Sequence, residues 1–98
     1  MAYGIVLEFA GIGQKEYDSV NEKLGLDMAA GKGDFPKGLK SHAGGTTADG
    51  GLFVYEVWDS KADYEAWMGG RLGAALGALG VPAPVRVTDL DIVGFYTP

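Results

Sequence analysis

The order of strand-like and helix-like segments constrains this chain most, because few arrangements accommodate it. Short apolar or alternating runs predict four strands, at residues 3–9, 39–46, 52–58 and 85–96. Apolar residues three and four apart predict two helices, at residues 14–24 and 61–79. Gly25 and Gly80 are suited to end these helices, and Gly69-Gly70 predicts a bend in the second one. The expected order is βαββαβ in a single domain of residues 1–98.

This order predicts an α+β fold, in which a four-stranded antiparallel sheet carries two helices on one face. Such an arrangement is ferredoxin-like. In an isolated domain the open face of the sheet should alternate towards polar residues, but the first, third and fourth strands are apolar on both faces. A second copy of the chain, packed sheet to sheet under two-fold symmetry, is the expected cover. We therefore expect a homodimer.

The connection from Leu26 to Gly38, with the sequence LDMAAGKGDFPKG, shows no sustained periodicity. We expect it to have no regular structure of its own. Connections of this length often cover a binding site, and the alternative is a plain surface loop.

Composition excludes several classes of function. The formal net charge is -5, and the eight Lys and Arg residues are scattered, so nucleic acid and anionic membranes are not expected partners. No apolar run is long enough to span a bilayer, and the expected location is the cytoplasm. Cysteine is absent and there is one histidine, so a metal site is not expected. No cofactor is expected either, since GKGDFPKG lacks the spacing of a phosphate-binding loop.

Several stretches together suggest a family. GLKSHAGG, DGGLFVYEVWDSKADYEAW, RLGAAL and GVPAP resemble the antibiotic-biosynthesis-monooxygenase-like branch of the dimeric α/β-barrel superfamily, over nearly the whole chain. The resemblance implies a ligand pocket within each subunit, between the sheet and its helices. The superfamily includes cofactor-free monooxygenases of aromatic polyketides, haem-degrading enzymes, polyketide cyclases and lactone isomerases. The haem-degrading members resemble one another in carrying a ligand on the second helix, where this chain has no histidine.

His42, in the stretch KSHAGG, is the candidate catalytic residue. Its ordinary pKa of about 6.5 suits proton transfer near neutral pH. As a general base it would deprotonate a phenol or an activated carbon acid, which then reacts with oxygen or closes a ring. The following Gly44 leaves room for a flat ligand. The alternative is a structural histidine, and the side of the sheet that it faces separates the two.

Five further residues are candidates for binding a planar substrate: Tyr17, Asn21, Tyr55, Trp67 and Arg71. Aromatic side chains with polar tips suit such pockets, an amide orients a substrate oxygen, and a guanidinium binds a carboxylate or enolate. The alternative is core packing for the three aromatic residues, a solvated helix position for Asn21 and a surface ion pair for Arg71.

Three hypotheses follow for the function. The first is a homodimer that binds an aromatic or polyketide-like molecule, as a cofactor-independent monooxygenase with His42 as base. A cyclase or isomerase would use the same base without oxygen. A non-catalytic binding or assembly protein would have a small or filled pocket.

Overall fold

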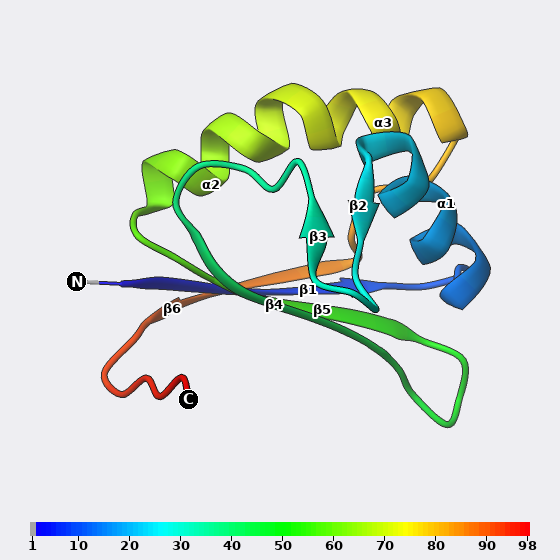
Figure 1. The fold of residues 1–98 in the computed structure, drawn as a ribbon. Helices are drawn as coiled ribbons and strands as arrows, with labels where there is room; N and C mark the ends of the chain where they lie inside the picture. The colour runs from blue at the N-terminus through cyan, green and yellow to red at the C-terminus, as the bar shows by residue number, and fades with distance from the viewer. Residues whose placement is uncertain (1) are drawn as a thin grey trace.

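A computed structural model describes residues 2–98 and shows a four-stranded antiparallel sheet with all helices on one face (Figure 1). The strands of this sheet, in spatial order, are β4 (Leu39–Thr46), β5 (Leu52–Trp58), β1 (Tyr3–Phe9) and β6 (Arg86–Asp91). The helices are α1 (Gln14–Leu24), α2 (Lys61–Trp67) and α3 (Gly73–Leu79), and a π-helical turn, η1 (Met68–Leu72), joins the last two. The predicted ferredoxin-like α+β fold is confirmed.

The alternation of β5 decides which of its side chains face the helices. The buried residues on the inner face of β5 are Leu52, Val54, Glu56 and Trp58, and those of β1 are Tyr3, Ile5, Leu7 and Phe9. Phe53 and Tyr55 point the other way and are 41% and 40% exposed. Glu56 is therefore a carboxylate in a row of core residues, and it pairs in register with Ile5.

The second helical segment begins and bends as predicted. The Ser60 hydroxyl accepts a hydrogen bond of 3.2 Å from the Asp63 amide, so α2 begins at Lys61. Gly70 departs from helical geometry, with φ -112° and ψ -112°, and produces the bend between α2 and α3. Gly80 adopts the left-handed conformation and ends α3.

The connection expected to lack structure instead contains a small hairpin. Its strands are β2 (Leu26–Asp27) and β3 (Lys32–Gly33). Gly33 makes the close approach possible, because its φ is +132° and any side chain there would clash with the carbonyl oxygen of Gly25. The hairpin lies on the helical side of the sheet (Figure 1).

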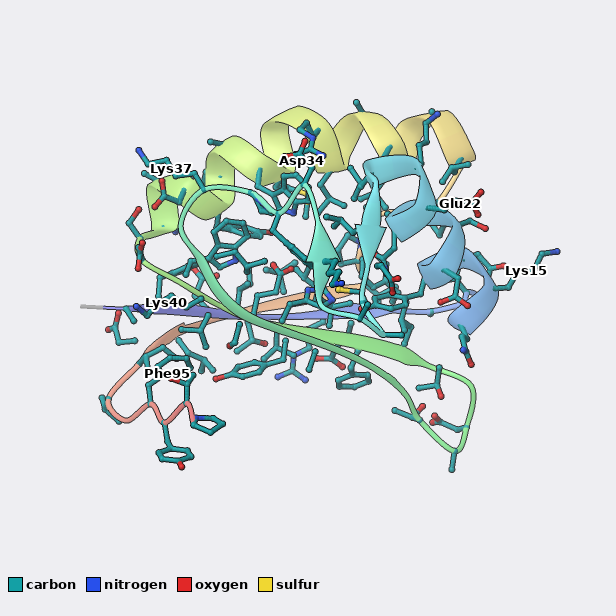
Figure 2. All side chains as sticks on the ribbon, viewed as in Figure 1. Lys15, Glu22, Asp34, Lys37, Lys40 and Phe95 are labelled. Atoms are coloured by element: carbon teal, nitrogen blue, oxygen red, sulfur yellow. The ribbon has the colours of Figure 1, made fainter. Side chains whose placement is uncertain are left out.

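The last strand is also shorter than expected, ending at Asp91 instead of Tyr96. Asp91 pairs with Tyr3, the first residue of β1, so the residues beyond have almost no partner strand left. The C-terminal segment turns under the open face of the sheet, where Phe95 lies (Figures 1 and 2). Within residues 2–98, no helix has the length and apolar character that crossing a membrane requires.

Candidate active site

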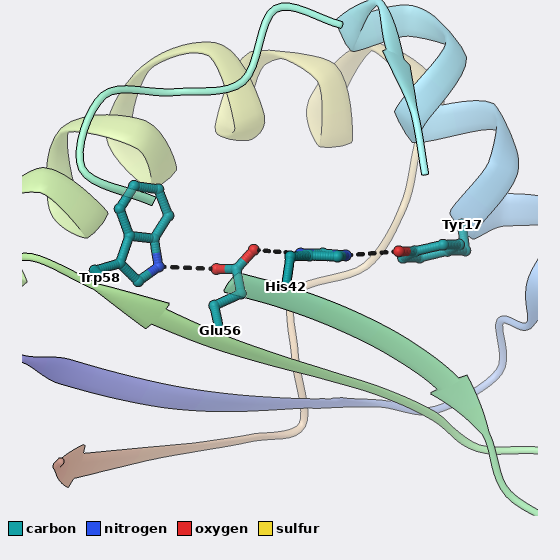
Figure 3. A network of polar contacts seen from close by, with 4 residues as sticks. All are labelled: Tyr17, His42, Glu56 and Trp58. Carbon is teal, nitrogen blue, oxygen red and sulfur yellow. Dashed lines mark hydrogen bonds and ion pairs between the residues drawn. The ribbon is translucent and has the colours of Figure 1, made fainter. Parts of the chain in front are cut away.

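Four side chains between the sheet and the helices form a continuous hydrogen-bonded chain (Figure 3). The Trp58 indole N–H donates to Glu56 Oε1 over 3.1 Å. Glu56 Oε2 lies 2.7 Å from His42 Nδ1, and His42 Nε2 lies 2.6 Å from the Tyr17 hydroxyl oxygen. We call these four residues the polar chain.

The sheet register explains how the polar chain assembles. His42 of β4 lies directly opposite Glu56 of β5, and directly opposed residues share a face. Trp58 is two residues beyond Glu56 and therefore faces the same way. Tyr17 comes from α1 and lies against Gly44, where a methyl group would be only 2.6 Å from its ring carbons Cε1 and Cζ. The structure thus places His42 on the helical side of the sheet.

The burial of Glu56 fixes the role of each imidazole nitrogen. Glu56 is 3% exposed, and a buried carboxylate is tolerated where donors satisfy it. Trp58 donates to one oxygen and His42 Nδ1–H to the other. Nε2 of the neutral imidazole is then an acceptor, so the Tyr17 hydroxyl donates to it. Glu56 therefore holds His42 in the tautomer whose Nε2 is an acceptor.

Tyr17 is a neutral phenol at physiological pH. Burial raises the pKa of its hydroxyl above the ordinary value, and Asn21 partly opposes this effect by lowering the pKa. A neutral hydroxyl that donates to His42 still has a free lone pair for another proton donor. Tyr17 can therefore pass a proton between a ligand and His42.

The polar chain borders a cavity of about 60 Å³ between the sheet and the helices. Tyr17, Asn21, His42 and Trp67, all expected at a binding site, line it together with Glu56. Much of the remaining wall is aliphatic and includes Leu7, Leu24, Val54, Leu72, Leu76 and Val81. The cavity is thus a mainly apolar space with the His42 imidazole at its edge.

The other two expected binding residues do not reach this cavity. Tyr55 lies on the outer face of the sheet, because the pleat directs its neighbour Glu56 inward. Arg71 is occupied elsewhere. It donates to the carbonyl oxygens of Leu24 and Asp34 over 2.9 Å each, pairs with the Asp34 carboxylate at 3.3 Å and lies 5.1 Å from the centre of the Trp67 ring. Arg71 therefore fastens the β2–β3 hairpin to the helices.

Sequence reasoning missed Glu56, although a signal was present. In LFVYEVW, Glu56 is the only charged residue, and it has the same parity as Leu52, Val54 and Trp58. A charge at a core position requires a buried partner, and the facing strand carries the only histidine.

Within residues 2–98, no cluster of three or more His, Cys, Asp or Glu side chains could hold a metal ion.

Replacing Gly44 by alanine should separate Tyr17 from His42. The new methyl group would overlap the Tyr17 ring, which must then move away. We expect the ¹⁵N chemical shift of His42 Nε2 to change as its hydrogen bond is lost. Gly45→Ala is the matched control, because a methyl group there meets no atom within 4 Å. Identical spectra for both variants would contradict the role given to Gly44.

Replacing Arg71 by alanine should loosen the β2–β3 hairpin. Loss of the hydrogen bonds to Leu24 and Asp34 removes about 1 kcal/mol of local stability for a half-exposed group. Hydrogen exchange at the Asp34 amide, which donates to Gly25, should become about fivefold faster. Arg86→Ala removes only an exposed pair with Glu8 and should leave that rate unchanged. Equal rates in both variants would contradict this function of Arg71.

Comparison with known proteins supports the fold. No family model matches the sequence, and no curated protein matches it. Among solved structures, a protein from Chloroflexus aurantiacus assigned to the antibiotic biosynthesis monooxygenases matches with a TM-score of 0.70 and 15% identity, over 99% of this chain and 98% of that one. Rv0793 from Mycobacterium tuberculosis matches with a TM-score of 0.65 and 15% identity, over 99% of this chain and 100% of that one.

A third structure is a monooxygenase from Streptomyces coelicolor, ActVA-Orf6, in complex with nanaomycin D. It matches with a TM-score of 0.63 and 17% identity, over 99% of this chain and 92% of that one. Identities this low establish the fold and not the reaction. The chain has the ferredoxin-like fold of the antibiotic-biosynthesis-monooxygenase-like proteins.

Proposed function

We propose that this protein binds a planar aromatic or polyketide-like molecule and acts on it without a cofactor, with His42 as general base. The observation that carries the proposal is the polar chain, which runs from a buried carboxylate through the only histidine to a phenol at the wall of a cavity. The match to a nanaomycin-bound monooxygenase supports the ligand class only by analogy of fold.

The proton would move along the polar chain in one direction. An acidic C–H or O–H group of the substrate gives its proton to the Tyr17 oxygen while the Tyr17 hydroxyl proton passes to His42 Nε2. The resulting imidazolium remains paired with Glu56, 2.7 Å from Nδ1. Burial strengthens the attraction between the His42 imidazolium and the Glu56 carboxylate. The substrate anion then forms next to an ion pair that has no net charge.

Oxygen would then react with the carbanion. For an anthrone-type substrate, a CH₂ group and O₂ become a C=O group and water: the anion reduces O₂, the new C–O bond gives a hydroperoxide, and loss of water leaves the ketone. The two hydrogens of the methylene leave in the water. Neither a metal nor an added reductant is needed for this balance.

The test is quinone formation from an anthrone in air, compared between wild type and His42→Gln. We expect oxygen from ¹⁸O₂ in the product and a loss of turnover of about 10²- to 10⁴-fold in the variant. Equal turnover would contradict the base. Conversion of the anthrone under nitrogen to a product without added oxygen would identify a cyclase or isomerase, which shares the proton-abstraction step. No turnover of any carbon acid would favour a non-catalytic binding protein.

The active form is proposed to be a homodimer joined through the open sheet face. Phe53, Tyr55 and Leu90 stand on that face at 41%, 40% and 39% exposure, which is apolar surface suited to burial against a second copy. We expect sedimentation at micromolar concentration to give twice the 10.2 kDa mass of the chain.

Phe53→Asp should convert this dimer to a monomer, because it places charge in the interface. Leu79→Asp is the matched control: Leu79 is 42% exposed but belongs to α3, on the opposite side of the molecule. A wild-type monomer, or equal dissociation of both variants, would contradict the interface.

A further inference from the structure

The cavity is too small for the ring system of the proposed substrate. Its volume is about 60 Å³, whereas an apolar cavity that accommodates benzene in another protein measures about 150 Å³. A second hollow, which we call the groove, has a volume of about 280 Å³ and shares Tyr17 and Leu52 with the cavity. The groove approaches the size of ordinary small-molecule sites, about 300 Å³ and above.

The groove reaches the acting end of the polar chain. Its wall includes Gly44, and a methyl group on Gly44 would lie 2.8 Å from the Tyr17 hydroxyl oxygen. The Tyr17 ring therefore fills the space over Gly44, and a ligand in the groove contacts Tyr17, whose hydroxyl oxygen hydrogen-bonds to His42. The reacting proton of a ring in the groove could reach Tyr17 while the rest of the ring stays outside the cavity.

The lining of the groove selects a type of ligand. Gly45 presents backbone without a side chain, and a methyl group there would meet no atom within 4 Å, so a flat ring has room to approach. Gln14 and Asp18 of α1 and Thr46 of β4 supply acceptor oxygens around it. No lysine or arginine is among the described residues that line the groove, and Asp18 carries a negative charge. Hydroxyl donors fit this lining, and carboxylates do not.

We propose that the groove binds the ring of the substrate, and that this substrate is an uncharged planar molecule with phenolic hydroxyl groups. The inference rests on the proposed function, since it places the substrate of the same base. Asp18 would then determine specificity, because its carboxylate accepts hydrogen bonds from hydroxyl groups and repels anions.

Binding without turnover tests the location of the ring. The probe is 1,8-dihydroxyanthraquinone, which has no methylene to lose, and its carboxylated analogue is the comparison. We expect Thr46→Trp to weaken binding of the probe at least tenfold by filling the groove. Leu76→Phe, which fills the cavity and does not touch the groove, should change it less than twofold. The reverse pattern would place the ring in the cavity and overturn the inference.

Asp18→Lys tests the selectivity, since the Asp18 side chain is exposed on α1. We expect wild type to prefer the uncharged probe at least tenfold and the variant to prefer the carboxylated analogue. An unchanged preference, or no binding of either probe to wild type, would overturn the inference. Groove binding with no turnover of any carbon acid would instead contradict the proposed function alone, and turnover that depends on His42 without groove binding would contradict this inference alone.

Discussion

Replacing Glu56 by glutamine is expected to lower turnover by up to about 10⁴-fold, as the equivalent change does in a serine-protease triad. The glutamine oxygen would accept from Trp58, which leaves the amide NH₂ facing His42 Nδ1. Nδ1 must then accept, so the proton of the neutral imidazole moves to Nε2. With its acceptor nitrogen protonated, His42 can no longer take the Tyr17 proton.

The ¹⁵N spectrum separates this cause from a general loss of structure. We expect the protonated nitrogen of His42 to be Nδ1 in wild type and Nε2 in Glu56→Gln, with similar thermal stability. Glu22→Gln is the matched control, since it makes the same change on the exposed face of α1. Full turnover in Glu56→Gln, or an unchanged protonated nitrogen, would contradict the role of Glu56.

Replacing Trp58 by alanine should have the largest effect on stability, about 3–5 kcal/mol in the free energy of unfolding. Trp58 is 0% exposed and contacts Tyr64 edge to face, with ring centres 5.9 Å apart. Its loss opens a cavity and leaves Glu56 Oε1 without a donor. Urea denaturation measures the change.

Trp58→Phe divides this loss into its parts, because it keeps an aromatic ring and removes the N–H donor. We expect about 1–3 kcal/mol for this variant, mostly from the unpartnered Glu56 oxygen. Trp67→Phe is the comparison: Trp67 is also buried, but it donates to no described residue through its indole nitrogen. Equal losses for the two variants would show that the hydrogen bond to Glu56 contributes nothing.

The helices and the main strands could be predicted because their signals are local. Periodicity identified β1, α1, β4 and β5, and Ser60 and the glycine pair marked the start and the bend of the second helical segment. The two-residue strands β2 and β3 have no periodicity, and their pairing depends on Gly33 approaching Gly25. The end of β6 depends on where its partner β1 begins, which is not a property of residues 85–96.

The candidate site was less predictable because it depends on pairs of distant residues. His42 was visible as the only histidine, but its partners lie 14 and 25 positions away. The contact with Tyr17 requires α1 to pack over Gly44, and the contact with Glu56 requires the register of β4 and β5. Tyr55 and Arg71 have side chains suited to binding a substrate, but neither reaches the cavity. The pleat of β5 places Tyr55 on the outer face, and Arg71 is hydrogen-bonded to the β2–β3 hairpin.

Hydrogen–deuterium exchange at the methylene group of an anthrone, followed by proton NMR under nitrogen, tests the base most directly. Proton abstraction is then observed without oxygen and without product formation. We predict that wild type in D₂O accelerates the exchange well above the buffer rate, and that His42→Gln and Glu56→Gln return it to that rate. Exchange no faster than in buffer, or equally fast in wild type and both variants, would contradict the account.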